Sequence, residues 1–191
     1  MRTPAVLDRP TPNTVSFQRI VSAAKPSLTQ MMLALGPLHG MRRDGLNRFD
    51  PFRRILPRLA LAPDPVRLLA AALKAQDAAL SWSPAAVIHG DLHPGQMLVD
   101  GRKKVWLVDL DDLALAPPEA DLGNLAAWMA THAEGPLEGR THEALSRLEA
   151  VSPLSDPALT DHFCRIALVR RALKLAEKGQ IWALDQLALR A

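Results

Sequence analysis

The feature that most constrains the fold is a polar loop between two short apolar runs, in a chain whose other apolar residues recur at helical spacing. Val87-Ile88 precedes the loop, and Met97-Leu98-Val99 follows it. The loop, His89–Gln96, holds two histidines, an aspartate and a glutamine, and Pro94-Gly95 limits its conformations. Such a segment packs poorly into a core but holds polar groups at fixed positions on a rigid support. We therefore expect a strand, a functional loop and a second strand here.

Apolar periodicity predicts helices on both sides of this loop. They are expected over 28–38, from Asp64 as N-cap to near Ser81, from about Asp121, over 158–178 and over 181–189. A third apolar run, Val105–Val108, follows the polar turn 100–104, whose Asp100-Gly101 dipeptide is typical of hairpins. The sequence thus predicts an α+β fold that is mostly helical, with a small β-hairpin at its centre.

Two segments near the N-terminus lack a clear apolar periodicity. Residues 1–26 contain four prolines and are expected to be irregular, apart from a short helical piece around 16–24. Residues 42–58 contain six arginines and two aspartates. We interpret them as a solvated helical surface rather than a phosphate-binding patch.

Composition excludes several classes of protein. The one cysteine, Cys164, leaves no disulfide framework or multi-cysteine zinc site, and its helical position indicates a buried, inert thiol. No apolar run reaches the roughly 18 residues of a membrane-spanning helix, and the N-terminus does not resemble a secretion signal, so we expect a cytoplasmic protein. The net charge is +3, but aromatic residues make up only 4% and tyrosine is absent. We therefore do not expect nucleic-acid binding.

A cluster of carboxylates follows the third apolar run. Residues 89–130 hold 7 Asp/Glu against 3 Lys/Arg, and Asp109, Asp111 and Asp112 lie within four positions. Strand alternation would place Asp109 and Asp111 on one side. Converging carboxylates repel one another unless a cation lies between them. Because Mg²⁺ is commonly held by one or two carboxylates together with substrate phosphates, the cluster indicates magnesium with a nucleotide.

The spacing of the polar residues supports this chemistry. His89 and Asp91 form a His-x-Asp pair, Gln96 follows five residues later, and Asp109 comes after the hairpin. Phosphoryl-transfer enzymes of the kinase type use a His-x-Asp loop, an amide ligand five residues on and a metal-binding Asp further along. An Asp near the incoming hydroxyl can accept its proton, while the amide oxygen and second Asp hold the metal.

These motifs resemble a known family. His-Gly-Asp-Leu-His-Pro-Gly-Gln-Met-Leu-Val, Leu-Val-Asp-Leu-Asp-Asp and Ala-Asp-Leu-Gly-Asn-Leu, in this order, are similar to those of the aminoglycoside phosphotransferase and choline kinase-like family. The resemblance is sharp over 85–130. It implies a protein-kinase-like fold in which residues 27–191 form the C-terminal lobe: a helical part (27–84), a catalytic core (85–130) and C-terminal helices (131–191).

The resemblance also implies roles for particular residues. Asp91 would be the catalytic base or hydroxyl-orienting group. Gln96, in place of the usual Asn, and Asp109 would be the Mg²⁺ ligands. His89 would brace the loop, and Asp121, at the start of a helix, would help to position it. The implied reaction takes ATP and a small hydroxyl-bearing substrate.

Other polar and aromatic residues keep two interpretations. His93 either faces a substrate or stabilises the turn. Asp111 and Asp112 either support the metal or are only solvated. Asp121 is most simply a helix N-cap. The tryptophans are expected in the core or at its boundary rather than on a stacking surface: Trp82, Trp106, Trp128 and Trp182.

The family's N-terminal β lobe is missing from the sequence. The residues before His89 contain no Gly-x-Gly-x-x-Gly loop and no Val-Ala-x-Lys strand, and Lys25, next to Pro26, does not fit the lysine's role. Positioning and electrostatics supply most of phosphoryl-transfer catalysis. We therefore expect weak or no transfer by this lobe alone, and a partner lobe or self-association through its exposed face.

Three other functions stay open. One is a non-catalytic kinase-like binding module or a truncated fragment. Another is a haloacid dehalogenase-type phosphatase, because Val-Trp-Leu-Val-Asp109 resembles the opening strand of that family. The third is a metallophosphatase built on His89, Asp91 and His93, which would need further ligands.

Overall fold

The computed structural model describes residues 25–100, 103–151 and 156–188. The helices in these ranges are α1 (Leu28–His39), α2 (Asp64–Leu80), α3 (Glu119–Thr131), α4 (Leu137–Val151), α5 (Pro157–Ala176) and α6 (Trp182–Ala188). The strands are β1 (Ala86–Ile88), β2 (Met97–Val99), β3 (Val105–Leu107) and β4 (Ala114–Ala116), and the 3₁₀ helices are η1 (Leu56–Leu61), η2 (Pro94–Gln96) and η3 (Leu110–Asp112). The expected α+β, mostly helical fold is confirmed. The irregular segment and short helical piece expected before residue 25 lie outside the described residues.

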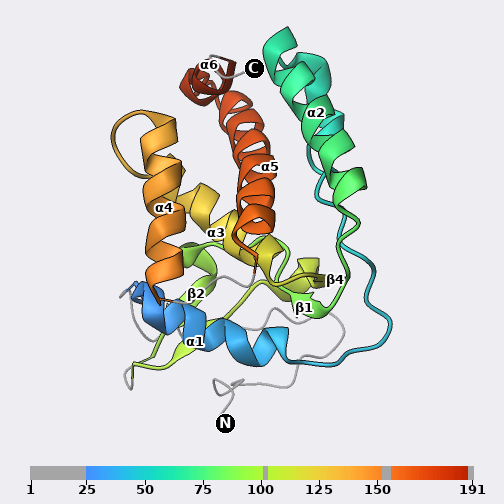
Figure 1. Ribbon diagram of the computed structural model, residues 1–191. Coiled ribbons are helices and arrows are strands. Elements are labelled where there is room, and N and C mark those ends of the chain that lie inside the picture. Colours follow the sequence, from blue (N-terminus) through green and yellow to red (C-terminus); the bar gives the residue numbers. More distant parts are fainter. Residues whose placement is uncertain (1–24, 101–102, 152–155, 189–191) are drawn as a thin grey trace, which may run out of the picture.

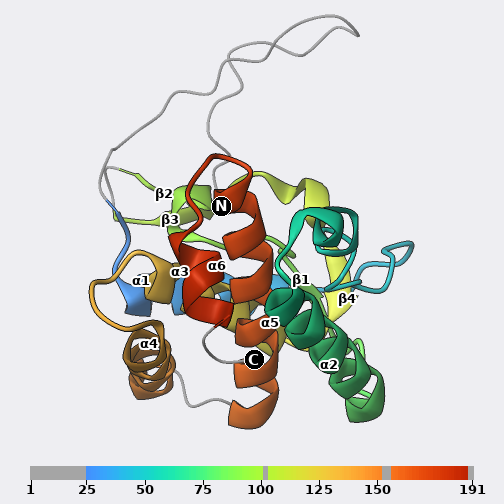
Figure 2. The ribbon, with the colours of Figure 1, turned by 90° about the horizontal axis from the view of Figure 1, so that it is seen from above.

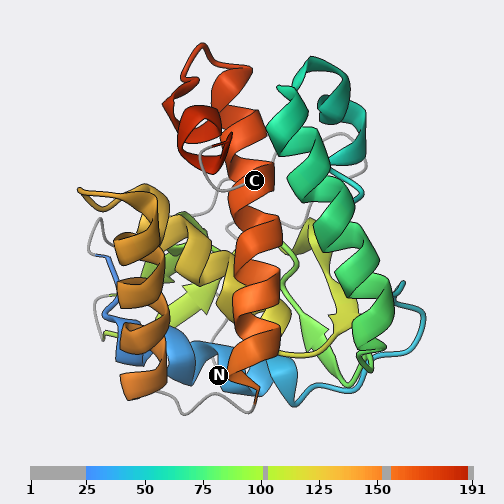
Figure 3. The same cartoon turned by 45° about the horizontal axis from the view of Figure 1, so that its top comes forward.

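Helix α5 stands in the middle of the molecule. Helices α4 and α2 lie on opposite sides of it, and α1 crosses below, beside the short strands (Figure 1). The view from above shows the same arrangement of α4, α5 and α2 (Figure 2). Helix α3 runs underneath α5. Figure 3 shows α3 between α5 and the strands. The strands therefore sit at one end of a helical framework.

The short strands form two separate antiparallel pairs. Strands β2 and β3 make the expected hairpin, with Met97 opposite Leu107 and Val99 opposite Val105. Strand β1 pairs with β4, which the sequence analysis did not predict, and Ile88 lies opposite Ala114. The chain thus leaves one pair at Ile88, passes through the polar loop and enters the other pair at Met97.

The helix boundaries follow from local capping. Asp156 accepts a hydrogen bond from Leu159 N at 2.9 Å and begins α5, with a proline at its first position. The expectation that Asp64 is the N-cap of α2 is wrong. Pro63 precedes the helix and Asp64 lies in its first turn, where a carboxylate favours the positive end of the helix dipole. Ser81, in the left-handed conformation with φ 46°, ends α2 near the predicted place.

The arginine-rich segment 42–58 is not the helical surface that we expected. It forms turns that lead into η1, and two of its own side chains, Phe52 and Ile55, are buried. Two of its own residues bond to β4: Phe49 N donates to Leu115 O at 2.9 Å, and Leu115 N donates to Asn47 O at 2.9 Å. The segment is thereby fixed against β4, which places Arg53 and Arg54 beside the polar loop.

The main helical contact joins α3 to α5. A side chain at Gly123 would approach the Cys164 backbone nitrogen to 2.6 Å, so only glycine allows the two helices to lie this close. Cys164 is fully buried there, and burial raises the pKa of its thiol, in agreement with an inert residue. Among the residues described, no helix has the length and apolar content needed to cross a bilayer.

Candidate active site

A cavity of about 790 Å³ opens where the polar loop, the segment after β3 and helix α5 meet. Four of the residues predicted from the sequence line it: Asp91, His93, Asp109 and Asp111. Trp128 and Trp182 also line it, so these two are not only core or boundary residues as expected. These four residues, from before and after the hairpin, therefore face one common space, whereas His89, Gln96 and Asp121 do not line it.

Asp121 holds the start of the loop in place. Its fully buried carboxylate accepts hydrogen bonds from His89 N at 2.8 Å and Gly90 N at 3.0 Å, and it contacts His39 Nε2 at 3.1 Å. The expectation that Asp121 caps a helix is wrong. Helix α3 begins at Glu119, so Asp121 lies inside its first turn and its side chain is free to bind the loop backbone.

Gly90 makes the sharp turn between His89 and Asp91. Its φ of 81° is in the left-handed region, which glycine adopts without steric cost. A Cβ at this position would overlap the carbonyl oxygen of Asp112. The loop can thus approach the η3 turn only with glycine here, and this approach brings Asp91 close to Asp112.

His89 ties the loop to the end of β3. Its ring is fully buried, and Nε2 donates to Val108 O at 3.0 Å. Val108 N in turn donates to Gln96 O at 3.0 Å. These contacts hold the two ends of the loop and the segment before Asp109 in one unit, while His89 itself does not line the cavity.

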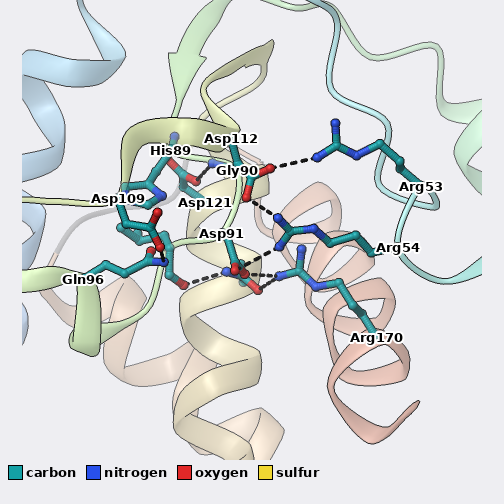
Figure 4. A network of polar contacts seen from close by, with 12 residues as sticks. Arg53, Arg54, His89, Gly90, Asp91, Gln96, Asp109, Asp112, Asp121 and Arg170 are labelled. Atoms are coloured by element: carbon teal, nitrogen blue, oxygen red, sulfur yellow. Dashed lines mark hydrogen bonds and ion pairs between the residues drawn. The ribbon is translucent and has the colours of Figure 1, made fainter. Parts of the chain in front are cut away.

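Asp91 lies between two arginines, as Figure 4 shows. Arg54 Nη1 donates to Oδ2 at 3.0 Å, and Arg170 Nη2 donates to Oδ1 at 2.9 Å. Burial alone would raise the pKa of Asp91, but the charges of Arg170 and Arg54 outweigh it and hold the pKa below its usual value. Asp91 is therefore ionised at neutral pH.

The arginines extend this cluster to the η3 turn and to α3. Arg54 also pairs with Asp112, and Arg53 pairs with the same carboxylate at 2.8 Å. Asn124 accepts from Arg170 Nη2 at 2.6 Å and donates to Leu92 O at 2.6 Å. Sequence reasoning missed Arg54, Asn124 and Arg170. Only Asn124 carried a signal, because it lies one helical turn after Asp121 and so faces the same loop.

Gln96 and Asp109 form the candidate metal-binding pair. Gln96 Nε2 donates to Asp109 Oδ2 at 2.9 Å, while Gln96 Oε1 is buried and has no partner among the described residues. Turning the amide over would place that oxygen beside the carboxylate. Adjacent oxygens around an octahedral Mg²⁺, at 2.0–2.1 Å from the ion, are about 3 Å apart. In the described conformation the amide nitrogen faces Asp109; with the amide turned over, Gln96 Oε1 and the Asp109 carboxylate could together hold a magnesium ion.

The remaining ligands of such an ion would have to be phosphate oxygens and water. No group of three or more His, Cys, Asp or Glu residues in the described part of the chain could hold a metal. This leaves the metallophosphatase interpretation without its ligand set. The haloacid dehalogenase interpretation also loses support, because β3 belongs to an antiparallel hairpin rather than to the opening of a parallel sheet.

His93 and Asp111 both line the cavity, but neither is placed there by the strand alternation used in the sequence analysis. His93 Nδ1 accepts from Gly95 N at 3.0 Å while its ring lines the cavity, and burial lowers the pKa of the ring. Asp109 adopts φ 61° and begins η3, so strand alternation does not apply to Asp109 and Asp111. Both still line the cavity because η3 turns Asp111 back toward it.

Comparisons with known proteins identify the family and the fold. The sequence profile of the phosphotransferase enzyme family matches residues 26–154. The fold is similar to choline kinase LicA from Streptococcus pneumoniae, with a TM-score of 0.57 and 18% identity over 90% of this chain and 69% of that one. A structure of LicA in complex with AMP gives a TM-score of 0.58 and 18% identity, covering 92% of this chain and 67% of that one.

A choline/ethanolamine kinase family protein from Mesorhizobium loti also has a similar fold. Its TM-score is 0.60 at 18% identity, over 97% of this chain and 74% of that one. No curated protein matches the sequence. At this identity the solved structures establish the kinase-like fold.

Proposed function

The chain belongs to the phosphotransferase enzyme family, and from this premise we propose that it transfers the γ-phosphoryl group of ATP to a hydroxyl of a small molecule with the help of Mg²⁺. One observation carries the proposal. Asp91 and Asp109, which lie on either side of the hairpin in sequence, line the same cavity. Phosphoryl transfer needs a group that orients the hydroxyl and a metal ligand within one space.

Asp91 is the proposed catalytic residue. Because its pKa is held below the usual value, it is a weak base and acts mainly by accepting a hydrogen bond from the acceptor hydroxyl. A carboxylate offers about four lone-pair positions, so Arg54 and Arg170 leave room for the hydroxyl. The two arginines fix the direction in which Asp91 points, and His89 and Asp121 fix the backbone that carries it.

Gln96 and Asp109 are the proposed Mg²⁺ ligands. Gln96 Nε2 lies 2.9 Å from Asp109 Oδ2, and turning the amide over would bring Oε1, which lacks a partner in the part of the chain that the structure describes, to that position. When bound, the ion neutralises charge on the nucleotide phosphates. Asp111, exposed on η3 at the cavity wall, could support it through water.

The proposed domain assignment follows from the family. Residues 27–191 correspond to a kinase C-terminal lobe, with a helical part to 84, the catalytic core to 130 and the C-terminal helices after it. The described strands form two-stranded pairs, and none belongs to a larger sheet that could cover a nucleotide. We therefore propose that a partner lobe or a second chain completes the nucleotide site, and that this chain alone transfers phosphate slowly or not at all.

Calorimetry with ATP, with and without MgCl₂, tests the metal-dependent step. The wild-type chain should bind ATP at millimolar concentrations only with Mg²⁺, and Asp109→Ala should lose that dependence. Gln96→Leu, which keeps the buried volume but removes the amide oxygen, should lose it as well. Asp44→Ala, at an exposed position outside the cavity, is the matched control.

Two results would contradict the proposal. Absence of Mg²⁺-dependent ATP binding would favour the non-catalytic module or the fragment, and unchanged binding by Asp109→Ala would remove the metal assignment. Where ADP release in the presence of candidate alcohols shows transfer, Asp91→Asn should abolish it while ATP binding remains.

A further inference from the structure

The wall of the cavity that α5 provides carries an excess of positive charge. Arg170, Arg171 and Lys174 lie on this helix, and Lys178 follows its end. Arg170 is paired with Asp91. The other three form no ion pair with any residue in the described ranges, although all line the same cavity. Three cations thus line one cavity without an ion pair to a described residue; Arg171 is half-buried, and Lys174 and Lys178 are exposed.

The carboxylates of the cavity do not neutralise these cations. Asp91 is already bound by Arg54 and Arg170, and Asp112 by Arg53 and Arg54. Asp109 is paired with Gln96, and Figure 4 shows it on the other side of Asp91 from Arg170. Asp111 belongs to the same η3 turn as Asp112. The negative charge therefore gathers around η3, whereas the positive charge gathers on α5.

Arg171 is the residue that most clearly indicates an anionic ligand. Its Nε is buried and has no hydrogen-bond partner among the described residues. Burial, followed by the charge of Arg170, lowers its pKa to about 10, so the guanidinium remains charged at neutral pH. Arg171 as a whole is half-buried, and a buried donor without a partner on such a cation is unfavourable in an unliganded protein. Such a group is expected where a ligand supplies the counter-ion.

Arg171 and Lys174 line the same cavity as the proposed catalytic residue. The charges of Arg171 and Lys174 both act on His93, and Asp91 acts on Arg171. His93 and Asp91 belong to the same loop and line the same cavity. An anionic group bound by Arg171 and Lys174 would therefore hold a hydroxyl of the same small molecule near Asp91.

The aromatic residues of the cavity suit a cationic ligand less well. A quaternary ammonium ion is typically recognised by several open aromatic faces. Trp128 stacks on His132 with ring centres 4.0 Å apart, and the Trp182 ring already has Arg140 5.7 Å from its centre. Each tryptophan thus has one face occupied, and a cation between them would also face the unpaired charges of α5.

We propose that the phosphate acceptor is an anionic alcohol, whose phosphate or carboxylate group binds Arg171 and Lys174 while its hydroxyl lies at Asp91. This inference rests on the proposed phosphotransferase function and specifies its substrate class. Lys178, beyond the end of α5, contributes to the same positive field.

Titration calorimetry of the full chain with four probes at equal ionic strength tests the inference without any nucleotide. The probes are glycerol 3-phosphate, glycerate, glycerol and choline, so that phosphate, carboxylate, neutral and cationic alcohols are compared. We expect binding of glycerol 3-phosphate, glycerate or both, and at least tenfold weaker binding of glycerol and choline. The stronger of the two anions identifies the charged group.

A double variant and its matched control locate the binding. Arg171→Gln/Lys174→Gln should weaken anion binding at least tenfold. Arg147→Gln/Lys74→Gln, which removes the same charges at exposed positions on α4 and α2, should leave it unchanged. Circular dichroism and urea unfolding verify that both variants are folded. If the first double variant is unfolded, Lys174→Gln alone serves in its place, with an expected loss of at least threefold.

Three outcomes would overturn the inference. Choline or glycerol could bind as tightly as the anions, or the double variant could bind the anions as tightly as the wild type does. The third outcome is that the double variant loses as much affinity for Mg²⁺-ATP as for the anions. The last would show that the cations serve the nucleotide phosphates. The same titrations separate this inference from the proposed function. Mg²⁺-ATP binding without anion binding would reject only the acceptor class, and anion binding without Mg²⁺-ATP binding would reject the phosphotransferase.

Discussion

Arg170 Nη2 on α5 donates to Asp91 Oδ1 in the polar loop at 2.9 Å, across 79 residues of sequence. The same nitrogen donates to Asn124 on α3 at 2.6 Å. One guanidinium thereby joins the central helix, the helix beneath it and the proposed catalytic residue. Its side chain is only 12% exposed, so these contacts are shielded from water.

Arg170→Gln should lower the stability of the fold. Hydrogen bonds to charged groups contribute about 1.5–3 kcal/mol, so we expect a loss of about 2 kcal/mol in the free energy of unfolding. Arg165→Gln is the matched control on the same helix, because Arg165 pairs with Asp161 at the surface. That variant should lose less than about 1 kcal/mol. Urea unfolding measures both, and equal losses would contradict the role given to Arg170.

Asp121→Ala should be among the most destabilising substitutions in the loop support. It leaves His89 N and Gly90 N without acceptors, and each buried donor left unpaired costs about 1–3 kcal/mol. We expect a total loss of about 4 kcal/mol. Asp156→Ala, which removes an ordinary N-cap, should cost about 1 kcal/mol. If unfolding curves of the two variants coincide, Asp121 does not support the loop.

Gly90→Ala should damage the turn that carries Asp91. The new side chain would adopt a positive φ and overlap the Asp112 carbonyl, for which we expect a cost of about 3 kcal/mol. Gly139→Ala is the control, since Gly139 lies in α4 with open space around it. This change should stabilise the chain by about 0.5 kcal/mol. Thermal unfolding compares the two, and a tolerated alanine at position 90 would argue against the tight approach of loop and η3.

The contact between Asp77 and His162 should make the fold sensitive to acid. Burial alone would raise the pKa of Asp77, but hydrogen bonds with His162 and from Trp82 Nε1 outweigh it and hold the pKa below its usual value. A carboxylate of this kind stabilises the fold at pH above its unfolded pKa of about 4. That contribution disappears as the pH falls through the lower, folded pKa.

Urea unfolding between pH 6 and pH 2.5 checks this dependence. The difference in unfolding free energy between the wild type and Asp77→Asn should be largest near pH 6 and shrink below about pH 4. Asp44→Asn, at an exposed position, should show no such trend. A difference that stays constant over this range would mean that Asp77 is not the titrating group.

Local sequence patterns were sufficient to predict most of the elements that carry the site. β-Branched and aromatic residues predicted the strands at Val87-Ile88 and Val105–Val108, and the spacing of polar residues placed Asp91 and Asp109 in one cavity. Strand β4 was missed because Ala114-Leu115-Ala116 has low β propensity and is held by pairing with β1. The roles assigned to the individual site residues remain predictions.

The arginines of the site could not be found from sequence alone. Arg54 lies 37 residues from Asp91, and Arg170 lies 79 residues away. Neither spacing belongs to a helix or hairpin pattern, so only tertiary structure brings them together. The segment around Arg54 was interpreted as a helical surface because its composition is polar, whereas pairing with β4 and burial of Ile55 determine its course.

The distribution of Arg54, Asp91 and Arg170 along the chain has a consequence for refolding. Helices gain most of their backbone structure from neighbours in sequence, but this triad is complete only after segments far apart have docked. During renaturation, far-ultraviolet ellipticity would consequently recover ahead of ligand binding. The delay between the recovery of ellipticity and the recovery of ligand binding would measure how long the central helix takes to dock against the polar loop.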